Sequence, residues 1–261
     1  MGSTFRYIIL KPGADRMKSR RLYEIIEYVR EHKFSSLNEL MKTFQVSTAT
    51  IHRDIAVLVR ENRLKKVHGG VAAVRLEAEL PPYIADHYRE RLRRDSEEKL
   101  LIAEKALAEI ADGDTIFLDS STTVYYLGKL LQQSGWSNLT IVTNSLLIIQ
   151  EFHLFPPQYF MIALGGNYDL QLNAFLGRAT LRQLDELSID KLFLSALGFS
   201  PTGISSRHEN HAIFLGRLIE RVGKVYLLIT GNKFDKNGIF RIAPLSQIDQ
   251  VISDAPVPGY F

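Results

Sequence analysis

Apolar residues recur at helical spacing three times in the first quarter of the chain. Each set follows the i, i+3, i+4 and i+7 positions that form one face of a helix, or most of them. The sets are Leu22, Ile25, Ile26 and Val29, then Leu37, Leu40, Met41 and Phe44, then Ile51, Ile55, Leu58 and Val59. Ser36 and Ser47 precede the second and third sets, where a hydroxyl group caps a helix well. The pattern predicts three short helices that share one core.

The link between the second and third predicted helices is only "QVS", residues 45–47, so these helices must turn sharply against each other, as in a helix-turn-helix. At the start of the third helix the polar side chains lie off the apolar stripe and are expected to face outward. They are Ser47, Thr48, Thr50, His52 and Arg53. Hydroxyls and a helix N-terminus bind phosphates, whereas His and Arg reach base edges or the backbone. We therefore predict that this helix enters the major groove of DNA.

Residues 62–74, "NRLKKVHGGVAAV", contain two short strand-like runs around a turn at 68–70. Such a basic hairpin is typical of the wing of a winged helix, and Lys65, Lys66 and His68 are expected to contact DNA. Each feature alone is common on any solvated surface. Their order along the chain favours a winged helix-turn-helix DNA-binding domain over residues 19–74.

Beyond residue 96, short apolar runs alternate with helical segments. The runs cover residues 115–118, 139–142, 159–164, 191–196 and 225–229. Continuous apolar strands between helices predict a mainly parallel sheet that is covered on both faces. The expected fold class is α/β, with a mainly parallel α/β domain over 97–261. Residues 75–96, charged and with a Pro pair, are the expected linker, and residues 1–18 an N-terminal extension or expression remnant.

Polar or glycine-rich turns follow all five predicted strands. In a parallel sheet, ligands bind beyond the carboxyl ends of the strands. The candidate ligand-binding residues at these ends are Asp119, Ser120, Ser121, Thr122, Thr123, Thr143, Asn144, Ser145, Gly165, Gly166 and Lys233. A single Ser/Thr-rich turn is more often a plain helix cap. The convergence of five such turns, one of them a hydroxyl-rich helix start, predicts a site for a phosphorylated or acidic small molecule.

Charge divides the chain in the same way. Residues 1–74 carry a net charge of +7 and the rest −4, within a total of +3 for 261 residues. This asymmetry fits a small domain that binds a polyanion, joined to a larger domain with a different function.

There are no cysteines, which excludes disulfides and thiolate metal sites and suits a reducing cytoplasm, where we expect the protein. No apolar run approaches the roughly 20 residues of a membrane span, and neither a metal nor a cofactor is expected.

The segment "SLNELMKTFQVSTATIHRDIAVLVRENRLKKVHGGV" resembles the DNA-binding region of the DeoR family of bacterial transcriptional regulators. It keeps the VS, TI, RD and HGG elements of the family in register. His52 departs from the pattern, because the family usually carries the first Arg of a pair at that position.

The second half is similar to the effector-sensing domain of the same family, through "GDTIFLDSSTT", "IVTNS", "LGG", "DKLFLSALG" and "NKF". That family domain is similar to ribose-5-phosphate isomerase and binds phosphorylated sugars or related metabolites. The resemblance implies that Ser121, Thr122 and Thr123, with Lys233, hold a phosphate. It also implies that Glu209 lies near the sugar, with Asp119, Asn144, Gly165 and Gly166.

The function expected from these patterns is that of a repressor of a carbohydrate-metabolism operon. Its partners would be operator DNA, a phosphorylated sugar or related effector, and further copies of itself in a dimer or tetramer. One alternative is a sugar-phosphate isomerase with a DNA-binding appendage. It is disfavoured because "FLSALG" offers no carboxylate where the similar isomerases have an acidic cluster. Another alternative, a general nucleic-acid-binding or structural protein, leaves the polar strand ends unexplained. We therefore expect no catalytic residues.

Overall fold

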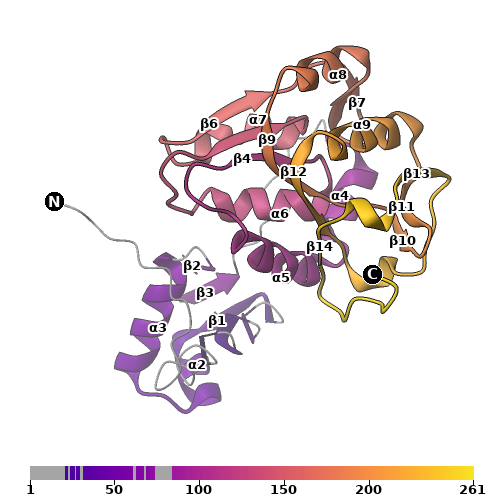
Figure 1. Ribbon diagram of the computed structural model, residues 1–261. Helices are drawn as coiled ribbons and strands as arrows, with labels where there is room; N and C mark the ends of the chain where they lie inside the picture. Colours follow the sequence, from indigo (N-terminus) through magenta and orange to yellow (C-terminus); the bar gives the residue numbers. More distant parts are fainter. Residues whose placement is uncertain are drawn as a thin grey trace. The chain divides into compact units, whose positions relative to one another are not determined.

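The computed structural model describes residues 21–22, 24–26, 28–29, 32–60, 63–67, 69–73 and 84–261 (Figure 1). The chain divides into two compact units, Met1–Ala78 and Glu79–Phe261. A winged helix-turn-helix followed by a mainly parallel α/β domain is therefore confirmed as the fold class. Among the described residues, no helix is long and apolar enough to cross a membrane.

The N-terminal unit contains two helices with defined bounds and a three-stranded antiparallel sheet. Its elements are β1 (Phe34–Ser36), α2 (Leu37–Phe44), α3 (Thr48–Arg60), β2 (Leu64–Val67) and β3 (Gly70–Ala73). The described residues of the first predicted helix are also helical. The sheet order is β1-β3-β2, so the predicted hairpin gains a third strand that the sequence pattern did not indicate. The apolar stripes of all three helices meet in one buried cluster, together with Leu64 and Val71 of the hairpin.

Both predicted caps begin their helices as expected. Ser36 forms a capping box with Glu39, in which each side chain binds the other residue's backbone N–H. The Ser47 hydroxyl accepts a hydrogen bond from the backbone N–H of Thr50 at 3.3 Å. Between the two helices, Gln45 takes a left-handed conformation with φ 51°. Local side-chain chemistry thus sets the start of α3 and the sharpness of the turn.

The paired glycines of the hairpin have two different roles. Gly69 has φ 82°, a turn conformation that glycine adopts without strain. Gly70 lies against β1, and a Cβ atom there would stand 2.2 Å from the backbone oxygen of Ser35. The pair therefore makes the turn and allows the third strand to approach.

A partly buried ion pair anchors α3 to the first helical segment. Asp54 is 1% exposed, and its two carboxylate oxygens accept hydrogen bonds from Nε of Arg21 at 2.7 Å and Nη2 of Arg21 at 3.3 Å. Its neighbour Arg53 is exposed. The two residues of the "RD" pair thus have different roles. Asp54 holds the helix in place, and Arg53 points outward.

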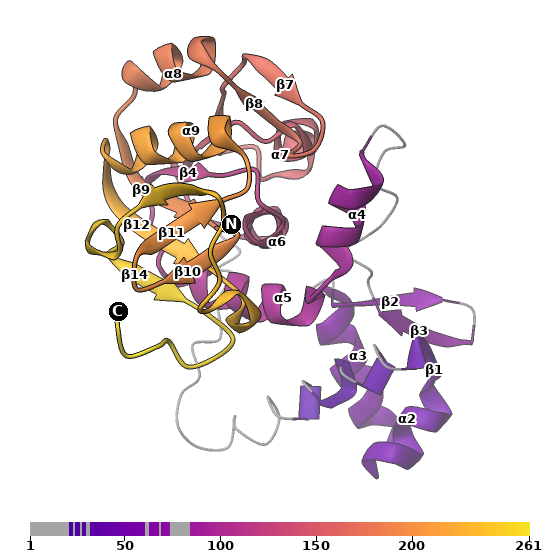
Figure 2. The same cartoon turned by 90° about the vertical axis from the view of Figure 1, so that its right-hand side faces the viewer.

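The C-terminal unit is built on a six-stranded sheet in which every neighbouring pair is parallel. In spatial order its strands are β14 (Gln250–Ile252), β12 (Val222–Leu228), β9 (Ile189–Leu194), β4 (Thr115–Leu118), β5 (Thr140–Thr143) and β6 (Phe160–Ala163). The helices are α4 (Asp86–Arg93), α5 (Ser96–Leu107), α6 (Thr122–Leu131), α7 (Leu146–Gln150), α8 (Arg178–Asp185) and α9 (Glu209–Ile219). Helices α8 and α9 cover one face, and α5 and α6 cover the other (Figure 2).

Smaller strands extend this unit beyond the predicted elements. They are the hairpin of β7 (Asn167–Asp169) with β8 (Ala174–Leu176), and an antiparallel sheet of β10 (Gly198–Ser200), β11 (Gly203–Ser206) and β13 (Phe240–Ala243). The five predicted strands all exist. However, β9 and β12 begin two and three residues before the predicted starts, at Ile189 and Val222, where polar residues or glycine interrupt the apolar run.

The second half of the expected linker is folded. Residues 86–93 form α4, and its Tyr88 and Leu92 are almost fully buried in the C-terminal unit. The Tyr88 hydroxyl donates to the backbone oxygen of Ser120 at 3.2 Å, and the Tyr126 hydroxyl donates to that of Leu92 at 3.1 Å. The expectation of a linker over all of 75–96 is therefore corrected, because charged residues on the outer face of α4 mask its two buried anchors.

We predict that Asp54→Ala destabilises the N-terminal unit by about 1.5–3 kcal/mol, the usual contribution of hydrogen bonds to a charged group. The measurement is hydrogen exchange of the α3 amides in the full chain, which should lose protection while β4 and β9 keep theirs. Arg53→Ala, one residue away and exposed, is the matched control and should leave protection unchanged. Equal protection of α3 in the Asp54 variant and the unaltered chain would contradict the anchoring role.

Candidate functional site

The N-terminal unit presents the first turns of α3 as an exposed polar surface. Thr48, His52 and Arg53 are exposed, as predicted for a helix that faces a ligand. Thr50 is half-buried, and its hydroxyl lies 3.0 Å from that of Ser47. Ser47 and Thr50 therefore complete the helix start, and the longer side chains of His52 and Arg53 extend the surface.

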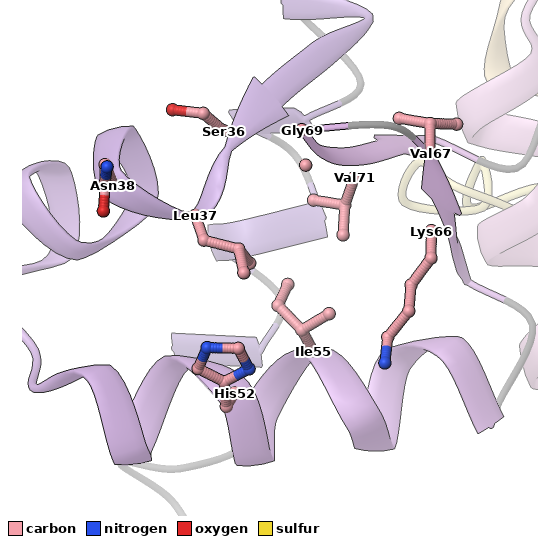
Figure 3. Close-up of a pocket in the computed structure, with 10 residues that line it drawn as sticks. Ser36, Leu37, Asn38, His52, Ile55, Lys66, Val67, Gly69 and Val71 are labelled. Atoms are coloured by element: carbon pink, nitrogen blue, oxygen red, sulfur yellow. The ribbon is translucent and has the colours of Figure 1, made fainter.

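A groove of about 460 Å³ separates α3 from the wing strands and the start of α2. Figure 3 shows His52 and Ile55 on one side of this groove, with Lys66 extending from β2 toward α3. Lys66 lies on the same face of β2 as the buried Leu64, because side chains alternate along a strand. Two predicted DNA-contacting residues from different elements, His52 and Lys66, thus line one groove.

Lys65 occupies a different position from Lys66. It is exposed, lies on the opposite face of β2 from Lys66, and does not line the groove. The structure thus separates two lysines that the sequence treats alike. His68 lies outside the described residues, so its predicted DNA contact stays a prediction.

In the C-terminal unit, the parallel strands bring their carboxyl ends to one edge. Leu118 at the end of β4 is in register with Thr143 of β5 and Phe193 of β9. The residues that follow these ends, with Thr123 on α6 and Lys233 after β12, form what we call the strand-end cluster. Its members are Asp119, Thr123, Asn144, Ser145, Ser195 and Lys233.

Asp119 links the end of β4 to the end of β9 by a hydrogen bond. It is fully buried, and its carboxylate accepts hydrogen bonds from the backbone N–H of Ser121 at 2.8 Å and of Ser195 at 3.0 Å. Burial raises the pKa of Asp119 to about 6, although the hydrogen bonds from Ser121 and Ser195 and the charge of Lys233 lower it. Since both oxygens are engaged, this carboxylate is poorly placed to act as a proton-transfer base.

Several other predicted ligand residues bond within the protein. Ser121 caps α6, because its hydroxyl accepts a hydrogen bond from the N–H of Val124 at 3.3 Å. The Thr143 hydroxyl donates to the backbone oxygen of Leu118 at 2.7 Å.

Ser120 is 3% exposed, and its backbone oxygen accepts a hydrogen bond from the Tyr88 hydroxyl. Thr122 begins α6 and is 7% exposed, next to the open backbone N–H groups of the first turn.

Gly165 and Gly166 approach α8 rather than the strand-end cluster. The oxygen of Gly165 accepts from Thr180 at 2.8 Å and from Gln183 at 3.1 Å. A Cβ atom on Gly166 would lie 2.1 Å from the Thr180 hydroxyl. The glycines therefore allow a helix to pack closely at the end of β6.

Glu209 and Lys233 lie in contrasting environments. Glu209 is exposed at the start of α9, whereas His211, two residues further on, is buried. Lys233 is half-buried, and its Nζ donates to the hydroxyl of Ser195 at 3.3 Å. The polar side chain that α9 buries is thus that of His211, not that of Glu209.

Sequence reasoning missed the contribution of the segment before β4. Arg91 of α4 donates through Nη2 to the backbone oxygen of Gln171 at 2.8 Å, and its guanidinium lies 5.1 Å from the ring centre of Tyr88. Lys99 of α5 is 3% exposed, and its Nζ donates to the backbone oxygens of Arg91 and Arg94. A basic residue inside an apolar helical stripe, as in "EEKLLIA", is the signal that could have singled out Lys99.

Positive charge on buried and half-buried side chains dominates this region. Burial, together with the neighbouring charge of Lys233, lowers the pKa of Lys99 to about 7. Burial likewise lowers the pKa of Lys233 to about 8, although Asp119 raises it, and burial lowers the pKa of Arg91. Asp119, Asp95 and Asp169 oppose these charges, and Asp95 accepts a hydrogen bond from Asn232 at 2.7 Å. Because Arg94 and Lys236 also act on the two lysines, the cations outnumber the carboxylates here, and this balance favours an anion.

Several buried polar atoms of the same region have no hydrogen-bond partner among the described residues. They are Nε of Arg91, Oγ1 of Thr123, Oδ1 of Asn144, Oγ of Ser145, Nδ2 of Asn173 and Nε2 of His211. Buried polar groups are rarely left unpaired. Their concentration at the strand ends indicates a site for a polar ligand. The described residues contain no cluster of three or more side chains suited to hold a metal ion.

These features define a class of protein, a DNA-binding regulator with a winged helix-turn-helix and a separate α/β ligand-sensing unit. Residues 21–76 match the DeoR-like helix-turn-helix domain, and residues 94–255 match the DeoR C terminal sensor domain. The chain belongs to the DeoR family of transcriptional regulators.

Curated relatives agree with this assignment. The chain is 32% identical to the HTH-type transcriptional regulator IolR of Bacillus subtilis, over 92% of this chain and 93% of that protein. It is 30% identical to the glycerol-3-phosphate regulon repressor of Escherichia coli, over 92% of each. These relatives are regulators, in agreement with the expectation that this protein is not an enzyme.

Among solved structures, the chain is similar to a D-ribose-5-phosphate isomerase determined in complex with phospho-erythronic acid. The identity is 19% and the TM-score 0.38, over 53% of this chain and 54% of that one.

We predict that Arg53→Ala weakens operator binding by about 1–3 kcal/mol, the range for one side chain that reads a base or holds a phosphate. Lys66→Ala should also weaken binding, and Lys65→Ala should do so less, although both remove one charge from the same strand. Fluorescence anisotropy on a DNA site selected by the unaltered protein measures all three. Equal losses for Lys65→Ala and Lys66→Ala would contradict the assignment of the groove as part of the DNA surface.

Proposed function

We propose that this protein represses a carbohydrate-metabolism operon, and that a phosphorylated sugar or related metabolite bound at the strand-end cluster changes its affinity for the operator. The observation that carries the proposal is the set of three cationic side chains at the strand ends, Arg91, Lys99 and Lys233, of which Lys99 is buried and the other two are half-buried. Their hydrogen bonds go to carbonyl and hydroxyl oxygens rather than to carboxylates, and charge withdrawn from water without an opposite charge beside it is costly. An anion that enters this region adds negative charge beside them.

The phosphate position is proposed from the start of α6. Its first-turn N–H groups at Thr122 and Thr123 have no acceptor within the helix, and a helix N-terminus favours an anion. Ser121 already satisfies the N–H of Val124, so the other two remain for a ligand. Lys233, bonded only weakly to Ser195 at 3.3 Å, supplies a charge at the neighbouring strand end.

Helix α4 gives the proposed site a route to the DNA-binding unit. It brings Arg91 and Tyr88 to the strand ends, and it lies along the chain between the two family-matched ranges, 21–76 and 94–255. A ligand that contacts Arg91 therefore acts on the first helix of the C-terminal unit, which follows the boundary between the two units along the chain. A ligand shifts such an equilibrium only if it binds one arrangement more tightly, and a coupling of about 1–3 kcal/mol is typical.

We further propose that the protein acts as a homo-oligomer in the cytoplasm, with a dimer as the smallest form. A two-fold pair of winged helices matches a palindromic operator whose half-sites are spaced by helical turns of DNA. Sedimentation of the protein on its selected DNA site, with and without ligand, tests this part. A single copy bound per operator would contradict it.

The direct test of the function is a titration of the protein–DNA complex with phosphorylated sugars. At least one sugar phosphate should change operator affinity by about fivefold or more, as expected for a typical coupling free energy. A panel of phosphorylated sugars that leaves operator affinity unchanged throughout would contradict the proposed mode of regulation.

The titration of the buried amines predicts a pH dependence of ligand binding. The pKa of Lys99 is about 7 and that of Lys233 about 8, so both lose their protons in the free protein as the pH rises from 7 to 9. A bound phosphate dianion favours the charged amines, so binding takes up protons above pH 7. Affinity should therefore fall with rising pH, by up to about tenfold per pH unit for each proton taken up.

Isothermal titration calorimetry at pH 7, 8 and 9, in buffers of different ionisation enthalpy, measures both the affinity and the proton uptake. Lys233→Met should weaken binding and flatten the pH dependence. Lys105→Met, on the same helix as Lys99, is the control, because Lys105 binds the backbone oxygen of Ser253 and stands outside the charged region. Affinity that rises with pH would contradict the assignment.

A further inference from the structure

Helix α9 buries a histidine in its first turn. His211 is 9% exposed, and its Nε2 atom has no hydrogen-bond partner among the described residues. Nothing in the helix-turn-helix or in the phosphate position proposed above uses this side chain. A buried ring nitrogen without a partner requires an explanation, because desolvation of such a group is not compensated.

The neighbours of His211 determine what Nε2 can do. The Ser206 hydroxyl accepts a hydrogen bond from the N–H of His208 at 3.1 Å and lies 3.3 Å from Nδ1 of His211. Its proton is therefore available to Nδ1, which favours the neutral tautomer with the proton on Nε2. Burial lowers the pKa of His211 to about 4, so the ring is uncharged at neutral pH. Nε2 thus presents a neutral N–H donor.

Asn173 presents a second neutral donor. It is 1% exposed and has a left-handed backbone, with φ 54°, in the turn between β7 and β8. Its Oδ1 accepts from the Tyr168 hydroxyl at 3.2 Å, which fixes the amide so that Nδ2 points elsewhere. Nδ2 has no partner among the residues that the structure describes.

Arg91 relates these two donors to the strand-end cluster. It binds the oxygen of Gln171 in the same β7–β8 turn, and its charge lowers the pKa of His211. The carboxylate of Asp169, the last residue of β7, raises that pKa and acts on Arg91 as well. Asp169 therefore offsets the charge of Arg91 at this end, whereas Lys233 and the start of α6 leave the other end positive.

We propose that His211 and Asn173 form a second subsite of the strand-end cluster, where they donate hydrogen bonds to uncharged oxygens at the end of the effector remote from its phosphate. This inference rests on the proposed function. The subsite takes hydroxyl or carbonyl oxygens, because both donors are neutral and Asp169 opposes a second anion. Oδ1 of Asn144, which lacks a described partner, accepts from a ligand hydroxyl. The effector class is then the monophosphate of a polyhydroxy compound rather than a bisphosphate.

The test compares inorganic phosphate, glucose 6-phosphate, fructose 6-phosphate, ribose 5-phosphate and fructose 1,6-bisphosphate by calorimetry on the full chain. At least one monophosphate should bind the unaltered protein about tenfold or more tightly than inorganic phosphate, and more tightly than the bisphosphate. His211→Leu, which removes the donor at similar volume, should weaken that monophosphate by about tenfold, since a ligand oxygen is left unpaired. It should leave the affinity for inorganic phosphate unchanged.

Two further variants keep the result interpretable. His211→Gln retains an N–H donor and should recover part of the loss, and His153→Leu, at an exposed histidine, should change nothing. Unchanged monophosphate binding in His211→Leu, or a parallel loss of inorganic phosphate, would overturn the subsite while the proposed function stands. Tighter binding of the bisphosphate would overturn the neutral character of the subsite. Binding of no sugar phosphate to the unaltered protein would overturn the proposed function and this inference with it.

Discussion

The C-terminal unit depends on the parallel order of its six strands, because that order brings every carboxyl end to one edge of the sheet. Asp119, Asn144 and Ser195 follow three neighbouring strands and meet only for this reason. The hydrogen bond from the Ser195 N–H to Asp119 then holds the ends of β9 and β4 together, and the bond from the Ser121 N–H orders the turn after β4. Because the buried Asp119 carboxylate is engaged in these hydrogen bonds, it is not free to pair with the neighbouring cations. The resulting excess of positive charge favours an anionic ligand.

Helix α4 connects this chemistry to the rest of the chain. Its Tyr88 bonds the Ser120 backbone and its Arg91 bonds the Gln171 backbone, so it is held to two different parts of the strand-end edge. Lys99 binds the last carbonyls of the same helix. The protonation of Lys99 and the position of α4 are therefore linked, and an anion near Lys99 acts on both.

In the N-terminal unit, Asp54 has a comparable structural role. Its carboxylate holds α3 through Arg21, so that Arg53 and His52 face outward.

Features that depend on neighbours in sequence were predictable. The caps Ser36 and Ser47, the paired glycines Gly69 and Gly70, and the strand over 115–118 follow from local hydrogen bonding, backbone freedom and apolar pattern. Errors appeared where polar residues lie in buried elements. Strand β9 begins at Ile189, before the charged Asp190 and Lys191, because pairing with β4 and β12 overrides the local signal. Helix α4 was taken for linker for a similar reason, since its charges outnumber its two buried anchors.

The sequence by itself determined the two modules, their order, the recognition helix and the hydroxyl-rich strand ends, because each of these is written in a short local pattern. Only the tertiary structure decided which side chains meet. Arg91, Asn173 and His211 come from three elements far apart along the chain, and no local spacing relates them. The register of α9 turned His211 inward and left Glu209 exposed, a choice made by packing against the sheet. The strand alternation of β2 likewise separated Lys66 from Lys65. Packing sets the direction of each side chain and brings residues that are distant in sequence together. It therefore determines which side chains of the site can bind a ligand.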